Sequence, residues 1–98
     1  MAVNQKLTRV VRDRVVQELQ LNAAELLISF VDGSTMSVRI AESNSPPLHA
    51  GGRIRQISED QAKLLLECED GATLDLTIVD PGNAITVRDK NHQIEYLG

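Results

Sequence analysis

Two segments of the chain repeat one pattern, and this pattern constrains the fold more than any other feature. Residues 24–40 read AELLISFVDGSTMSVRI and residues 62–78 read AKLLLECEDGATLDLTI, with seven of seventeen positions identical. In each segment two runs of alternating apolar and polar residues flank an Asp-Gly pair, a strong signal for a β-hairpin. The likeness reflects either an internal duplication or the narrow choice of residues that such turns allow.

The alternation also predicts the register of both hairpins. A two-residue loop would place Ile28 opposite Ser37 and would mix apolar with polar side chains on both faces. A three-residue loop, with Gly33 or Gly71 in the left-handed region as a bulge, separates the two kinds of side chain. The expected apolar pairs are Ile28–Met36 and Leu26–Val38 in the first hairpin, and Leu66–Leu74 and Leu64–Leu76 in the second.

The N-terminal segment has a different periodicity. Its apolar residues recur at helical spacing and form one stripe, which consists of Leu7, Val10, Val11, Val15 and Leu19. Asn4 is a suitable N-cap because its short side chain accepts a hydrogen bond from an amide of the first turn. We therefore expect an amphipathic helix over residues 4–20.

Further short strands are expected on either side of the second hairpin. In loop 41–52, AESNSPPLHAGG, proline and glycine pairs exclude regular structure. A strand over residues 53–58 follows it, and the chain ends in a third hairpin after a turn at residues 80–83. The expected pairs are Ile57–Ala62 and Ile54–Leu65 before the second hairpin, and Val87–Ile94 and Ile85–Tyr96 in the last one.

These elements predict an α+β fold with one domain over residues 1–98. The helix is followed, over residues 25–97, by a curled, mostly antiparallel meander or small barrel of about six to seven short strands. The single cysteine, Cys68, cannot form an internal disulfide. No apolar stretch near Met1 is long enough for a signal peptide or a membrane span. We therefore expect a cytoplasmic protein with no membrane partner.

The charge is unevenly distributed along the chain. The formal net charge is −4, yet residues 1–20 hold four basic and two acidic groups, so this segment is positive. Lys6, Arg9 and Arg12 form a basic face, which is either solvated beside the acidic sheet or a contact surface for phosphate or an acidic protein. Only Phe30 and Tyr96 are aromatic, and this scarcity argues against a nucleic-acid partner.

The sequence assembles no catalytic or metal site. Cys68 alternates with the inward-facing residues Leu64 and Leu66 beside acidic residues, a pattern typical of a buried, unreactive thiol. His49 and His92 are far apart in the sequence and show no spacing of metal ligands. We therefore expect no enzyme activity, no catalytic residue, no cofactor and no bound metal.

Three hypotheses for function follow, and no motif is specific enough to indicate a family. The first is a non-enzymatic protein-interaction module that self-associates as a homodimer or higher oligomer through outward apolar residues or the helix stripe. The expected outward residues are Leu27, Ile54 and Leu65. The second is a nucleic-acid-associated accessory protein that uses Lys6, Arg9 and Arg12, and the third is small-molecule binding by loop 41–52 around His49.

Overall fold

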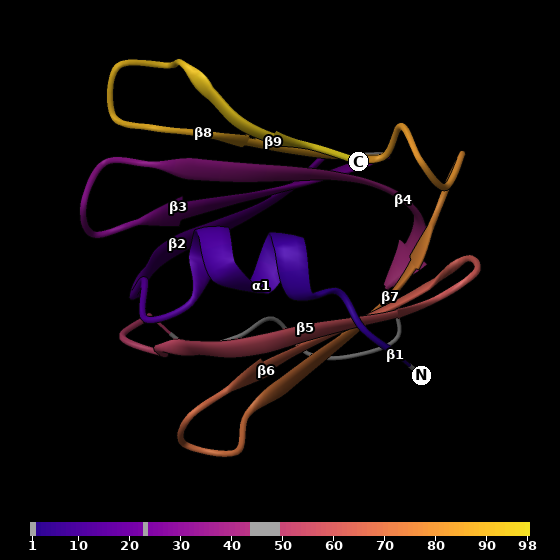
Figure 1. Cartoon of the computed structure of the whole chain (residues 1–98), viewed down its shortest axis with the longest axis horizontal. Helices are drawn as coiled ribbons and strands as arrows, with labels where there is room; N and C mark the ends of the chain where they lie inside the picture. Colours follow the sequence, from indigo (N-terminus) through magenta and orange to yellow (C-terminus); the bar gives the residue numbers. More distant parts are fainter. Residues whose placement is uncertain (1, 23, 44–49) are drawn as a thin grey trace.

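The computed structural model describes residues 2–22, 24–43 and 50–98. Along these residues a short strand and one short helix precede eight further strands (Figure 1). The N-terminal elements are β1 (Ala2–Val3) and α1 (Gln5–Val11). The strands that follow are β2 (Val16–Asn22), β3 (Glu25–Phe30), β4 (Thr35–Ser43), β5 (Ile54–Asp60), β6 (Lys63–Cys68), β7 (Thr73–Ile78), β8 (Ile85–Arg88) and β9 (Ile94–Leu97).

The prediction of an α+β fold is wrong, because the described chain is mostly antiparallel β and its helix has only 7 residues. The predicted helix over residues 4–20 stops at Val11, and its second half is strand β2. Asp13 has a positive φ of 69°, which interrupts the helix. Val15 and Val16 follow it, and β-branched residues favour a strand where they pack against a partner. Val16 faces Phe30 of β3.

Strand β4 is shared between two layers of the sheet. Its first part pairs with β3 and β8, and its last part pairs with β7. The register shifts between Ile40 and Glu42, and such a bulge lets a strand bend from one layer into the other. We call the layer of β2, β3, β8 and β9 the β3 layer, and the layer of β1, β5, β6 and β7 the β6 layer. The predicted meander is wrong because β4 lies between β3 and β7.

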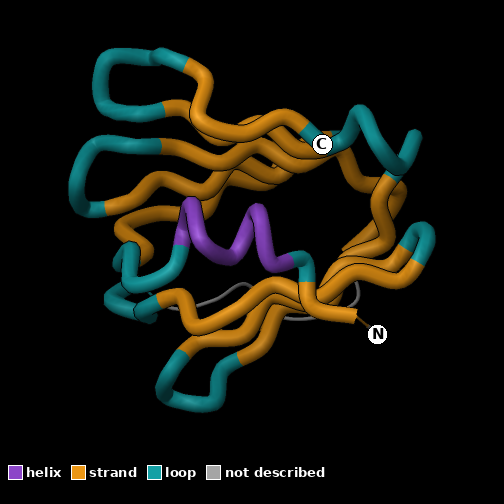
Figure 2. The backbone as a smooth tube through the Cα atoms, in the orientation of Figure 1, coloured by secondary structure: helices purple, strands orange, loops and turns teal. Residues whose placement is uncertain are grey.

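The two layers curl toward each other as a half-barrel, and α1 lies in the opening between them (Figures 1 and 2). At one corner the start of β2 meets the start of β5 through a bridge between Val15 and Arg53. Backbone hydrogen bonds reinforce this corner: Val16 N donates to Gly52 O at 2.8 Å, and Ile54 N donates to Arg14 O at 2.9 Å. The curl therefore brings two distant segments of sequence side by side.

The predicted registers of the two Asp-Gly hairpins are confirmed. The structure has the pairs Ile28–Met36, Leu26–Val38, Leu66–Leu74 and Leu64–Leu76. Gly33 and Gly71 have φ values of 92° and 91°, in the left-handed region that the bulged turn requires. The turn after β7 is also confirmed, with Asn83 N donating to Asp80 O at 3.0 Å.

Two other predicted registers are wrong. In β5, Ile57 faces Leu66 rather than Ala62, because the strand continues to Asp60 and turns at residues 61 and 62. Ile54 faces Cys68 rather than Leu65. In the last hairpin Val87 faces Tyr96, with a register shift after Val87, and Ile94 faces Arg88.

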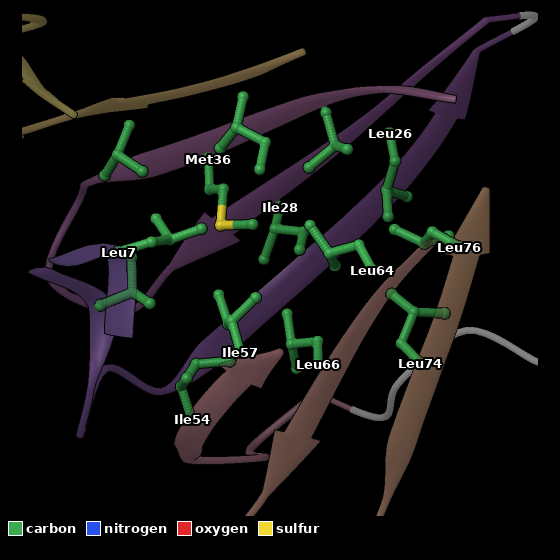
Figure 3. Close-up of a cluster of buried hydrophobic side chains, with 14 of the residues drawn as sticks. Leu7, Leu26, Ile28, Met36, Ile54, Ile57, Leu64, Leu66, Leu74 and Leu76 are labelled. Carbon is green, nitrogen blue, oxygen red and sulfur yellow. The ribbon is translucent and has the colours of Figure 1, made fainter. Parts of the chain in front are cut away.

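One cluster of buried side chains joins the helix and both layers. Figure 3 shows Met36 of β4 and Ile28 of β3 pointing toward Ile57 and Leu64 of the β6 layer, with Leu7 of α1 at the side. Leu7 and Val11 of α1 are both 0 % exposed, so the apolar stripe of the helix covers the core of its own sheet.

Candidate functional site

A groove of about 750 Å³ lies between α1 and β5. Its walls are mostly polar side chains of these two elements. The lining residues are Val3, Gln5, Thr8, Arg9, Arg12, Arg55, Gln56 and Glu69. We call it the arginine groove, because three of the eight residues are arginines from two distant segments of the sequence.

Hydrogen bonds fix α1 on β5 and so define the groove. Thr8 Oγ1 accepts a hydrogen bond from Ile57 N at 3.1 Å and donates to Ile57 O at 3.3 Å. Asn4 N donates to the same Ile57 O at 2.8 Å, while Asn4 Oδ1 caps the helix by accepting from Leu7 N at 3.0 Å. Because Thr8 is buried, these bonds are protected from water.

The three arginines reach the groove in different ways. Arg9 lies in the last turn of α1, and Arg12 follows as the C-cap, so their spacing of three residues places them on one side of the helix. Arg55 lies in β5 where the register with β6 shifts between Ile54 and Gln56. The bulge leaves Arg55 without a cross-strand partner, and bulges commonly redirect a side chain in this way.

The groove is positively charged in a chain of net charge −4. Its lining has three basic residues and one acidic residue, a difference of +2. Arg9, Arg12 and Arg55 form no ion pair or side-chain hydrogen bond with any residue that the structure describes. Glu69 is paired instead with Arg53, whose Nε lies 3.6 Å from Glu69 Oε2. The three arginines therefore keep their donors available to a ligand.

Only part of the predicted basic face lines the arginine groove. Arg9 and Arg12 line the groove, whereas Lys6 is exposed outside it. Sequence reasoning missed Arg55, because its place beside the helix depends on a contact between segments more than forty residues apart. The one local signal for Arg55 is its positive charge between the apolar residues Ile54 and Ile57 of a short strand.

The predicted apolar interaction surface is not assembled. Ile54 is 0 % exposed and belongs to the core, so its predicted outward position is wrong. The register shift at Arg55 explains the difference, because it reverses the side on which Ile54 faces. Leu27 and Leu65 are half-buried and lie on β3 and β6, in different layers of the sheet.

The remaining sequence candidates contribute little. His49 lies outside the residues that the structure describes, so the loop-site hypothesis is not tested. Cys68 is 1 % exposed, and burial together with the nearby charge of Asp70 raises the pKa of its thiol. Within residues 2–22, 24–43 and 50–98, no group of three or more His, Cys, Asp or Glu side chains is arranged to hold a metal ion.

A smaller hollow of about 340 Å³ lies beside Arg14. Arg14 Nη2 donates to Glu95 Oε2 at 2.9 Å, and its Nε lies 3.9 Å from Asp32 Oδ2. The guanidinium carbon lies 5.9 Å from the centroid of the Phe30 ring. Hydrogen bonds from Ser34 lower the pKa of Asp32 below its ordinary value. Arg14 is thus largely occupied by neighbours within the chain, unlike the arginines of the groove.

The helix of the described chain is neither long nor apolar enough to cross a membrane. Comparisons with protein-family models, with curated proteins and with solved structures each gave no match.

Proposed function

We propose that the protein is a non-enzymatic interaction module that binds an acidic segment of a partner protein in the arginine groove. The observation that carries this proposal is the convergence of Arg9, Arg12 and Arg55 on one groove without an acidic partner among the described residues. Guanidinium groups bind carboxylates with two parallel hydrogen bonds, so unpaired arginines favour an anionic ligand.

The shape and setting of the groove support a protein partner over nucleic acid. Its eight lining residues include no aromatic side chain, so stacking of bases has no platform there. The net charge of −4 opposes the approach of a long polyanion, while a short acidic segment meets mainly the local field of the groove.

Binding of a fluorescently labelled hexaglutamate peptide, followed by anisotropy at low salt, tests the proposal. We expect Arg9→Gln and Arg55→Gln each to weaken binding about three- to tenfold, because each removes one charge pair. Arg39→Gln is the matched control: it removes the same charge from an exposed residue on β4, outside the groove. Equal loss in all three variants, or tighter binding of a thymidine oligonucleotide than of the peptide, would refute the proposal.

Self-association is a second candidate, favoured by strand β9. This strand pairs with β8 alone among the described strands, and its Ile94 and Leu97 are 50 % and 64 % exposed. An edge strand with exposed apolar side chains favours pairing with a second copy. Light scattering up to high micromolar concentration tests this candidate: a dimer that Leu97→Lys dissociates supports it, and a monomer throughout excludes it.

A cytoplasmic location is part of the proposal. Cys68 is free and buried, which suits a reducing compartment where thiols persist.

A further inference from the structure

We infer that the arginine groove takes a phosphomonoester, carried as a phosphorylated side chain in the acidic segment of the partner protein. This inference rests on the proposed function, because it specifies which anion of that segment enters the groove. The juxtaposition of Arg9, Arg12 and Arg55 around one groove is the observation behind it.

The number of donors exceeds what one carboxylate accepts. A carboxylate has two oxygens and one negative charge, and a single guanidinium with its planar fork satisfies both oxygens. Three guanidinium groups, unpaired within the part of the chain that the structure describes, leave most of their donors unused by such a ligand. A phosphomonoester has three terminal oxygens and a charge of about −1.5 to −2 at pH 7, so it engages several guanidinium groups at once.

The arrangement of the walls suits a compact, tetrahedral group. Arg9 and Arg12 approach from α1, and Arg55 approaches from β5, so the cations lie on two sides of the groove. The bonds between Thr8 and Ile57 keep these walls at a fixed distance, which reduces the entropy lost when the ligand binds. Clusters of arginines are the usual means of recognising phosphorylated motifs in proteins.

Glu69 repels an anionic ligand, so a substitution of Glu69 distinguishes a dianion from a monoanion. Its carboxylate lines the groove and is about half exposed in its pair with Arg53. A dianion is repelled by Glu69 more than a monoanion is. We therefore expect Glu69→Gln to strengthen binding of a phosphomonoester more than binding of a carboxylate.

The charge state also separates a phosphomonoester from the phosphodiester of nucleic acid. The second pKa of a phosphomonoester is about 6, so its charge falls as the pH decreases from 7.5 to 5.5. A phosphodiester and a carboxylate keep their single charge over this interval. Binding that weakens below pH 6 therefore identifies the monoester.

The test is a titration of the full chain, labelled with ¹⁵N, with N-acetyl-phosphoserine amide. N-acetyl-glutamate amide is the carboxylate control, and succinate is a control of equal charge without phosphorus. At pH 7.5 we expect phosphoserine to bind at least tenfold more tightly than either control. Arg55→Gln should remove this preference, and Arg39→Gln should keep it. Lowering the pH to 5.5 should reduce the preference over N-acetyl-glutamate amide, whose single charge does not change.

Equal affinities for phosphoserine and succinate would overturn the inference, as would a preference that Arg55→Gln leaves intact. Tighter binding of a thymidine dinucleotide than of phosphoserine would overturn it as well. The proposed function is decided separately by hexaglutamate: a peptide that binds in the groove without any preference for phosphoserine leaves the function standing and removes the phosphate specificity alone.

Discussion

Thr8 joins the helix to the sheet, and replacing it with valine tests whether that joint stabilises the fold. Valine has nearly the shape of threonine and a similar preference for the helix, so the substitution removes the hydroxyl with little change in packing. Ile57 N then loses the acceptor that it has at 3.1 Å, whereas Ile57 O keeps its bond from Asn4 N at 2.8 Å. The substitution thus leaves one buried amide unsatisfied.

An unsatisfied buried amide costs about 1–3 kcal/mol, and we expect the free energy of unfolding to fall by that amount in Thr8→Val. For a chain of this size, a loss of about 1 kcal/mol lowers the melting temperature by about 4–8 °C. Thr8→Ser is the control: it retains the hydroxyl and loses one methyl group, a change of about 0.8 kcal/mol. Urea denaturation measures both, and a valine variant as stable as the wild type, or more stable than the serine variant, would refute this account.

Three further predictions concern the turns, the thiol and the acidic residue beside Arg14. Gly33→Ala and Gly71→Ala both place alanine at a φ near 90°, but the added Cβ meets a neighbouring side chain at 3.1 Å only at Gly33, so thermal unfolding should show the greater loss there. Cys68 should react with a thiol reagent only on unfolding, because it is buried and its pKa is raised; rapid reaction in the native protein would contradict this placement. The pKa of Asp32 is lowered in the folded state, so its contribution to stability is present above the ordinary value of 3.8 and is lost as the pH falls through the lowered pKa. Ser34→Ala should raise that pKa toward 3.8 in a carboxyl ¹³C titration, and an unchanged pKa would show that the Ser34 hydroxyl is not its cause.

The two Asp-Gly hairpins were predictable because their structure is determined locally. In each hairpin, the glycine at the left-handed position and the alternation of apolar residues permit one register. Both of these signals lie within the seventeen consecutive residues of that hairpin. The registers of β5 and the last hairpin were not predictable in the same way. Each contains a bulge, which shifts the pairing by one residue and is not visible in the alternation, and β5 also turns at residues 61 and 62, later than its sequence indicated.

The helix was only half predictable because its stripe continues into strand β2. Val15 and Leu19 fit a helical stripe, and their spacing of four residues also fits one face of a strand. The contact between Val16 and Phe30 decides in favour of the strand, and it is a tertiary contact. The wrong prediction of an α+β fold followed from this overestimate of the helix, because a helix less than half as long does not form a layer of its own.

The strand order and the role of Arg55 were not predictable from the sequence for the same reason, because both depend on the tertiary curl of the sheet. The bend of β4 between the layers brings β5 against the start of β2 and places Arg55 beside α1. Charge alone indicated Arg9 and Arg12, since they lie on the exposed side of the helix. Arg55 becomes part of the site only when the curl of the sheet is known.

The most direct test of the arginine groove is the set of Nε–Hε resonances of the arginines, recorded by NMR while hexaglutamate is added to the full chain. The account predicts that the resonances of Arg9, Arg12 and Arg55 shift together and saturate, while those of Arg39 and Arg88 stay in place. Shifts of similar size at all arginines, or shifts confined to arginines outside the groove, would contradict it.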